Sequence, residues 1–241
     1  MNLLAAFYRS AVTLALFALF GLGGLFVTPI VIVLRDVELC TRLLRLLWYP
    51  FVRLFVFTGL ITIDCTRLRE TRGSVIAANH PSLIDVVVVL ALVPKTLFVA
   101  KHSLKKNPFT SAMVRNASLP DDERLVDSAK PYLRKGWNVI VFPEGTRSPS
   151  KGGLWPFKRG AAQLAIRSGA PLVPLAVIQS PFRILGKHQY AWQMGSKKVK
   201  YTLVSGEPVS AVQQEGESMH SASRRVTSQL ERVFADGLLA G

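Results

Sequence analysis

Two short runs in this 241-residue chain carry side chains suited to proton transfer and anion binding. The first, residues 79–85, reads Asn-His-Pro-Ser-Leu-Ile-Asp and follows Val75–Ala78, an apolar run typical of a buried strand. We expect His80 in the turn and Asp85 in the first turn of a helix, so that Asp85 reaches one imidazole nitrogen. The other nitrogen then stays free to take a proton from a hydroxyl. The helix N-terminus disfavours an imidazolium and Asp85 favours it, which suits a base that becomes charged only during reaction.

The same spacing also fits a purely structural role. Ser82 and Asp85 stand three residues apart, as in a helix capping box, and Asp85 could serve only that purpose. His80 would then be an incidental residue at a strand end. The two roles are compatible, because a carboxylate has two oxygens.

The second run, residues 142–148, reads Phe-Pro-Glu-Gly-Thr-Arg-Ser and follows a β-rich segment that ends before a proline. Gly145 allows a tight turn with close approach of a ligand, and Arg147 offers a planar fork suited to phosphate. Glu144 is out of place beside a phosphate, so we expect it to orient Arg147 or to accept a hydrogen bond from a substrate hydroxyl. Downstream, Lys158 and the arginine after it add cations near a helix start. Taken alone, this run could equally be an ordinary turn with a surface arginine.

The composition favours a membrane or a polyanion as partner. Apolar residues make up 49% of the chain and charged residues only 19%, yet Lys and Arg outnumber Asp and Glu by 30 to 15. A disordered chain is excluded by this apolar content. Two cysteines argue against a disulfide-built scaffold and against a cysteine zinc site. An apolar and basic chain points to an anionic membrane surface or to nucleic acid.

The first sixty residues favour the membrane. No charged residue, Asn, Gln or His occurs between Ala11 and Leu34, a length that could cross a bilayer as a helix, although its three glycines and Pro29 could bend or break it. A second apolar stretch, Leu43–Ile63, contains two arginines, which predicts an amphipathic segment in the interface with Trp48 and its tyrosine neighbour at headgroup level. Arginines cluster after the first segment, so the positive-inside rule places the remainder on the cytoplasmic side.

The remainder alternates short apolar runs with helical stretches, which predicts an α/β fold with a mixed, mostly buried sheet flanked by helices. Together with the N-terminal membrane-seated helical pair, this gives two parts, a membrane-associated helical segment over 1–58 and an α/β domain over 59–241. The expected strands are 60–65, 74–78, 96–100, 138–142, 172–177 and 199–204. The expected helices are 83–92, 104–115, 123–135, 159–167 and 217–235.

The two runs together resemble the defining motifs of the glycerophospholipid acyltransferase family, which includes the 1-acylglycerol-3-phosphate acyltransferases. His80 and Asp85 match its His-x4-Asp box, and residues 142–148 match its Phe-Pro-Glu-Gly-Thr-Arg-Ser box. The order and the spacing of about sixty residues agree, and Leu172–Leu175 is similar to a later apolar strand with proline. The resemblance covers about residues 50–205.

The resemblance implies acyl transfer from an acyl carrier protein or coenzyme A thioester to a lysophosphatidate-like hydroxyl, without an acyl-enzyme. His80 would be the general base and Asp85 its orienting partner, with no metal or resident cofactor. It also implies membrane lipids as partners and, with the chain's size, a bacterial inner membrane. The residues predicted to contact substrate are Asn79, Ser82, Lys101, Glu144, Gly145, Thr146, Arg147 and Lys158.

One segment departs from the family pattern. A Gly-aromatic/apolar-x-Arg element often lies between the two boxes, but residues 115–124 contain no glycine, and three acidic residues crowd Arg124. The acceptor could therefore be another hydroxyl lipid, such as an ornithine-type lipid or a specialised polyene or acyl conjugate. A basic nucleic-acid-binding membrane protein is a further alternative, which explains the charge but not the apolar first third.

Overall fold

The computed structural model describes residues 3–34, 36–67, 71–101, 117–149, 152–181, 183–190 and 197–239. Within these ranges, one sheet has the strand order β1-β7-β6-β2-β5-β3-β4. The strands are β1 (Ile61–Arg67), β2 (Val75–Ala78), β3 (Thr96–Ala100), β4 (Ser118–Pro120), β5 (Asn138–Val141), β6 (Leu172–Ser180) and β7 (Val199–Ser205). Five of them, from β6 to β4, run parallel, whereas β7 is antiparallel to β6 and β1 is parallel to β7. The predicted mixed α/β architecture is confirmed.

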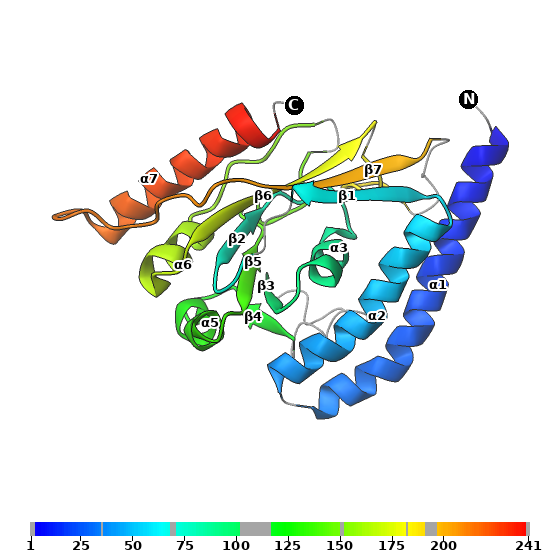
Figure 1. Ribbon diagram of the computed structural model, residues 1–241, viewed down its shortest axis with the longest axis horizontal. Coiled ribbons are helices and arrows are strands. Elements are labelled where there is room, and N and C mark those ends of the chain that lie inside the picture. The colour runs from blue at the N-terminus through cyan, green and yellow to red at the C-terminus, as the bar shows by residue number, and fades with distance from the viewer. Residues whose placement is uncertain are drawn as a thin grey trace.

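Helices cover both faces of the sheet (Figure 1). The helices are α1 (Leu3–Val33), α2 (Val37–Phe57), α3 (Asp85–Leu92), α5 (Leu125–Arg134), α6 (Gly160–Ser168) and α7 (Met219–Arg232), the last followed by a π-helical turn, η2 (Val233–Leu238). Alternate residues of β2 point to opposite faces, as strand geometry requires. Ile76 belongs to the core packed under α2 and α3, and Ala77 to the core packed under α5, α6 and α7.

The first two helices form an antiparallel hairpin along one side of the sheet domain (Figure 1). The rings of Phe17 and Phe20 on α1 pack against Phe51 of α2, with centroid separations of 5.8 and 4.3 Å. At the other end of α1, Arg9 donates hydrogen bonds to the backbone oxygens of Gly59 (3.0 Å) and Leu60. These contacts tie α1 to the junction between α2 and the first strand.

Helix α1 runs without interruption through the glycines and the proline that could have broken it. Gly23 instead permits close packing, because a Cβ at this position would lie 2.7 Å from a side-chain carbon of Leu47 on α2. Residues Leu3–Val31 are long and apolar enough to span a membrane, with mean hydropathy 2.2 and only 12% of their most apolar stretch buried within the protein. Large apolar side chains exposed on α1 are Leu3, Leu4, Phe7, Leu14, Leu19, Leu22, Leu25, Phe26, Ile30 and Val33.

The second helix differs from its prediction. It begins at Val37, after Asp36 accepts a hydrogen bond from the Leu39 amide at 2.8 Å as its N-cap, and ends at Phe57. The placement of Trp48 at headgroup level is wrong, because this side chain is only 2% exposed. Helix α2 packs against both α1 and α3, and its buried apolar side chains include Leu44, Phe51 and Phe55, whereas Leu46 and Phe57 are exposed.

Most other predicted elements agree with the structure to within about three residues at their ends. The sequence pattern did not predict β4, a three-residue edge strand. The helix predicted over 104–115 lies outside the described residues.

Candidate active site

Three neighbouring strands deliver polar residues to one edge of the sheet. Strands β2, β5 and β3 are parallel and adjacent, so their carboxyl ends meet at the same edge. His80 follows β2, Glu144 follows β5, and Lys101 directly follows β3. This topology brings together the two runs that lie more than sixty positions apart in the chain.

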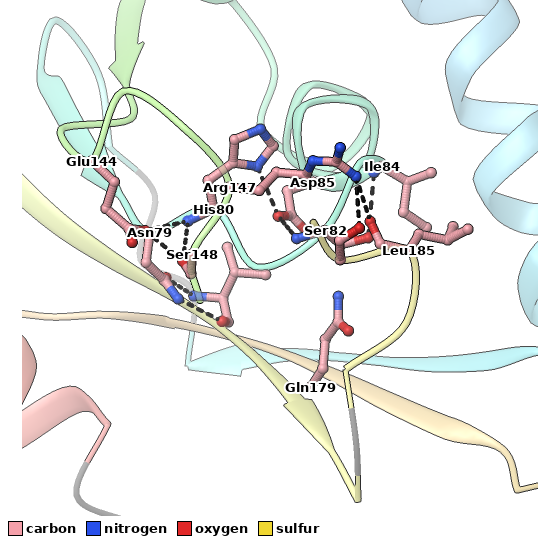
Figure 2. Close-up of polar contacts among 12 residues, drawn as sticks. Asn79, His80, Ser82, Ile84, Asp85, Glu144, Arg147, Ser148, Gln179 and Leu185 are labelled. Atoms are coloured by element: carbon pink, nitrogen blue, oxygen red, sulfur yellow. Dashed lines mark hydrogen bonds and ion pairs between the residues drawn. The ribbon is translucent and has the colours of Figure 1, made fainter. Parts of the chain in front are cut away.

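His80 and Asp85 form a hydrogen-bonded pair. The imidazole Nδ1 lies 3.0 Å from Oδ2 of Asp85, and the other ring nitrogen points away from the carboxylate (Figure 2). The His80 ring also packs on Phe142, with ring centroids 4.5 Å apart. Among the described residues, only Nδ1 of this ring has a hydrogen-bond partner. The arrangement therefore leaves Nε2 available to accept a proton from a bound hydroxyl.

Asp85 also holds the turn that carries His80. The Ser82 amide donates to the same oxygen, Oδ2, at 2.5 Å, and the Ser82 hydroxyl accepts weakly from the Ile84 amide at 3.4 Å. Burial raises the pKa of the Asp85 carboxyl, while the contacts with His80 and the Ser82 amide lower it. The Ser82–Asp85 capping box is not formed as predicted, because the helix begins at Asp85 with Ile84 as an N-cap that has no side-chain hydrogen bond, but one oxygen of Asp85 both orients His80 and holds the turn at Ser82. The fully buried Ser82 is placed to shape the turn, and substrate contact by Ser82 stays a prediction.

Glu144 accepts hydrogen bonds from two backbone amides and one hydroxyl. Its Oε1 accepts from the His80 amide at 3.0 Å and from the Ser148 hydroxyl at 2.5 Å, and its Oε2 accepts from the Trp155 amide at 2.9 Å. Ser148 in turn donates its amide to the His80 carbonyl oxygen at 2.7 Å. The expectation that Glu144 orients Arg147 is wrong, because its hydrogen bonds go to His80, Ser148 and Trp155 instead. Glu144 thereby holds the backbone amide of His80 in place (Figure 2).

Asn79 extends the pairing of β2 with β6 through its side chain. The amide nitrogen donates to the Val177 carbonyl at 2.9 Å, and the amide oxygen accepts from the Val177 N–H at 2.6 Å. The side chain is fully buried. These contacts favour a positioning role for Asn79, one residue before His80, and its predicted contact with substrate stays a prediction.

Arg147 holds a loop beyond β6 over the site. Its Nη1 donates to the carbonyl oxygens of Leu185 and Gly186, at 3.1 and 2.8 Å (Figure 2). The Leu185 carbonyl also accepts from the Leu83 amide at 2.9 Å, so this loop is tied to the start of α3. Nη2 and Nε of Arg147 have no partner among the described residues. The rest of its fork is therefore free for an anionic ligand.

The turn at Gly145 lies beneath a lysine. Gly145 has a φ of +64°, in the left-handed region, and a Cβ there would lie 3.0 Å from Nζ of Lys158. The Lys158 amide donates to the Pro143 carbonyl at 2.8 Å, which places this residue just before α6. Thr146 and Lys158 are exposed. Thus Thr146 and Lys158 lie on a solvent-facing rim around the Gly145 turn, and Lys158 stands two residues before α6, whose N-terminus is suited to anion binding.

Sequence reasoning missed a cation in this site. Arg183 donates to the backbone oxygens of Pro149 and, at 3.2 Å, Gly153. Its burial lowers the pKa of its guanidinium, and the charges of Glu144 and Asp85 raise that pKa. A single arginine after a strand carries no recognisable signal, so only the fold reveals its proximity to Asp85.

Arg124, in the segment that departs from the family pattern, is paired with an acidic neighbour. Its guanidinium contacts the Asp122 carboxylate at 2.6 and 3.3 Å on an exposed surface. The arginine at position 115, in the same segment, lies outside the described residues. Within the described ranges, no group of three or more His, Cys, Asp or Glu side chains is arranged to hold a metal ion.

Comparison with known proteins agrees with this fold. Residues 61–178, which include strands β1 to β5 and most of β6, match the family model described as Acyltransferase. A 1-acyl-sn-glycerol-3-phosphate acyltransferase from Neisseria gonorrhoeae is 29% identical over 182 residues, covering 68% of this chain and 70% of that protein. Proteins of the same name from Cocos nucifera and Escherichia coli are 31% and 30% identical, covering 58% and 54% of this chain.

Through residues 61–178 the chain is therefore similar to acyltransferases, and its curated relatives include proteins named 1-acyl-sn-glycerol-3-phosphate acyltransferase. It spans about half the length of several curated relatives it matches, 46% for the Cocos nucifera protein and 57% for that of Escherichia coli. The fold is similar to the crystal structure of the 1-acyl-sn-glycerophosphate (LPA) acyltransferase PlsC from Thermotoga maritima. The TM-score is 0.68 at 23% identity, with 100% of both chains covered.

Proposed function

We propose that this protein is an O-acyltransferase that moves a fatty acyl group from a carrier thioester to the hydroxyl of a lysophosphatidate-like lipid. The observation that carries the proposal is the His80–Asp85 pair, with Nδ1 held at 3.0 Å and Nε2 directed outward. The names of the curated relatives support the acceptor class.

In the proposed reaction, Nε2 of His80 removes the proton from the acceptor hydroxyl as its oxygen attacks the thioester carbonyl. The C–S bond then breaks, and the thiolate leaves with a proton returned from His80. Asp85 holds the ring and stabilises the imidazolium that forms in between. The products are the acylated lipid and the free thiol of acyl carrier protein or coenzyme A, and the reaction needs no resident cofactor.

The acceptor's phosphate group is proposed to bind at the cationic rim. The free part of the Arg147 fork, the exposed Lys158 above Gly145 and the exposed Lys101 lie at the same sheet edge as His80. An anionic group at this rim would place a neighbouring hydroxyl near Nε2 and would gain from the helix start of α6.

We further propose that the exposed apolar face of α1 is seated in a membrane. Helix α1 packs on α2, and α2 packs on α3, so the hairpin is continuous with the surface of the sheet domain. This geometry supports insertion of the hairpin from the side on which the domain lies. Its placement on the cytoplasmic face rests on the arginine distribution alone.

The test is transfer from acyl carrier protein and coenzyme A thioesters to lysophosphatidate in detergent micelles. The wild type is compared with His80→Ala and with His220→Ala; His220 is an exposed histidine on α7 whose imidazole hydrogen-bonds only to Arg159 among the described residues. Loss of a general base is expected to lower the rate by about 10²–10⁴. The proposal fails if the folded wild type releases no thiol with any acceptor, or if His80→Ala retains full activity.

A second acceptor class stays open for a specific reason. Because Arg124 is paired with Asp122, residues 117–124, the described part of the segment that departs from the family pattern, offer no free arginine for a phosphate. An acceptor panel that includes ornithine-type lipids and polyene or acyl conjugates decides this point. Transfer to one of these but not to lysophosphatidate would keep the chemistry and change the substrate.

A further inference from the structure

The carboxylate of Asp85 is only half satisfied by the contacts described so far. Its Oδ2 accepts from both His80 and the Ser82 amide, whereas Oδ1 is buried and has no hydrogen-bond partner within standard geometry. An unpaired buried acceptor on a carboxylate is costly, so native structures rarely leave one. Oδ1 therefore calls for a donor on its far side.

Tyr201 is the donor that the fold supplies. It lies on β7 directly opposite Gln179 of β6, and its side chain is completely buried. Gln179 extends toward the Ser82–Asp85 turn (Figure 2), and its Oε1 accepts from the Ile184 amide at 2.7 Å. That contact fixes the amide orientation, so Nε2 of Gln179 is the group that donates to the Tyr201 oxygen.

The proton of the Tyr201 hydroxyl must then go to a different acceptor. Burial raises the pKa of Tyr201 well above its usual value, and the nearby charge of Asp85 raises it further, while the Ser82 hydroxyl lowers it. The hydroxyl thus stays protonated and lies beside Ser82 and Asp85. Of these two, Asp85 carries the buried, unpaired oxygen.

We infer that Tyr201 is a positioning residue whose O–H donates to Oδ1 of Asp85 and thereby fixes the carboxylate that orients His80. The catalytic meaning rests on the proposed function, but the hydrogen bond itself does not. The result is a polar chain from Gln179 through Tyr201 and Asp85 to His80, which reaches the site from beneath the sheet edge.

This contact has a consequence for proton uptake by the His80–Asp85 pair. A donor to Oδ1 stabilises the form of the pair that carries a net negative charge. Removing that donor makes the pair take up a proton at higher pH. Among the described residues, the charged or titratable groups that face Asp85 are His80, Tyr201 and Arg183. The substitution Tyr201→Phe changes only one of these three groups.

The experiment compares Tyr201→Phe with Tyr132→Phe, a half-buried tyrosine on α5 away from the site. The histidine Cε1–H signal of His80, identified by its loss in His80→Gln, is followed by NMR across pH. We expect its titration midpoint to rise by about one pH unit in Tyr201→Phe, since a hydrogen bond to a charged group is lost. Tyr132→Phe should titrate like the wild type.

A second substitution keeps the ring and its packing. Site-specific 3-fluorotyrosine at position 201 makes the hydroxyl a stronger donor, so the His80 midpoint should fall. Opposite shifts from the two substitutions cannot come from a packing defect. The inference is overturned if the midpoint stays unchanged in Tyr201→Phe, or if both substitutions move it in the same direction.

These measurements do not require turnover. A protein without acyltransferase activity would refute the proposed function while the His80 titration still reports on Tyr201. If the protein is active, the acid limb of kcat/KM should move with the NMR midpoint.

Discussion

Glu144→Gln separates a substrate contact from a structural support. In the folded protein Glu144 receives three hydrogen bonds, from the amides of His80 and Trp155 and from the Ser148 hydroxyl. A glutamine keeps two of them when its oxygen replaces Oε1. Its NH₂ group then faces the Trp155 amide, which sets two donors against each other in a buried position.

The magnitude follows from this count. One hydrogen bond to a charged acceptor is lost, worth about 1.5–3 kcal/mol, and the two that remain become weaker because their acceptor is neutral. We expect the free energy of unfolding to fall by roughly 2–3 kcal/mol, or about 4–12 °C in Tm for a chain of this size. Because the same oxygen holds the His80 backbone, kcat should fall about 10- to 100-fold through misplacement of the base.

Glu231→Ala is the matched control. Glu231 on α7 accepts from the buried Phe157 amide at 2.7 Å, so its loss also leaves a backbone donor unpaired, but this contact does not touch His80. Thermal unfolding and steady-state kinetics of both variants are compared, and only Glu144→Gln should lose kcat. A higher KM for the acceptor with unchanged kcat in Glu144→Gln would refute this reasoning and make Glu144 a binding residue.

Three further predictions address the same site. Asp85→Asn should lower kcat at least 100-fold. Because burial raises the pKa of Asp85, wild-type stability should fall as pH rises from about 4 through the folded pKa. The Tm of Asp85→Asn minus the Tm of the wild type should therefore increase over that interval. Gly145→Ala should lose about 1–2 kcal/mol in chemical denaturation, because φ is +64°, and should raise the acceptor KM as the new Cβ displaces Lys158. Asn79→Ala should lose about 2–4 kcal/mol of unfolding free energy, because both Val177 backbone groups lose their partner, while KM stays within twofold.

The sheet was largely predictable from the sequence, because its strands are buried apolar runs bounded by turn residues. Thr96–Ala100 has the predicted bounds, whereas the edge strand β4 escaped, since three residues ending in proline carry no periodic signal. The glycines of α1 show a different limit. Gly23 looked like a possible helix breaker, yet its function is to let Leu47 of a neighbouring helix approach, which only the packing reveals.

The sequence predicted which residues gather at the candidate site better than it predicted the contacts that they make. The spacing of His80 and Asp85 predicted their pairing, which the structure shows. The partners of Glu144 could not be predicted, because the His80 amide is 64 positions away and the contacts to Ser148 and Trp155 depend on how the loop after Glu144 folds. No sequence motif marked Tyr201 or Arg183 as part of the site. Their positions near Asp85 depend on how the chain after β6 folds back toward α3.

The strand order also dictates when the protein can finish folding. Edge strand β1 follows the α1–α2 hairpin directly, but it pairs only with β7, near the opposite end of the domain's sequence. During synthesis the apolar hairpin therefore emerges long before β1 can acquire its partner. Early seating of the hairpin in a bilayer would shelter its apolar surface during that interval, so ribosomes translating this chain should reach the membrane before its sheet is complete.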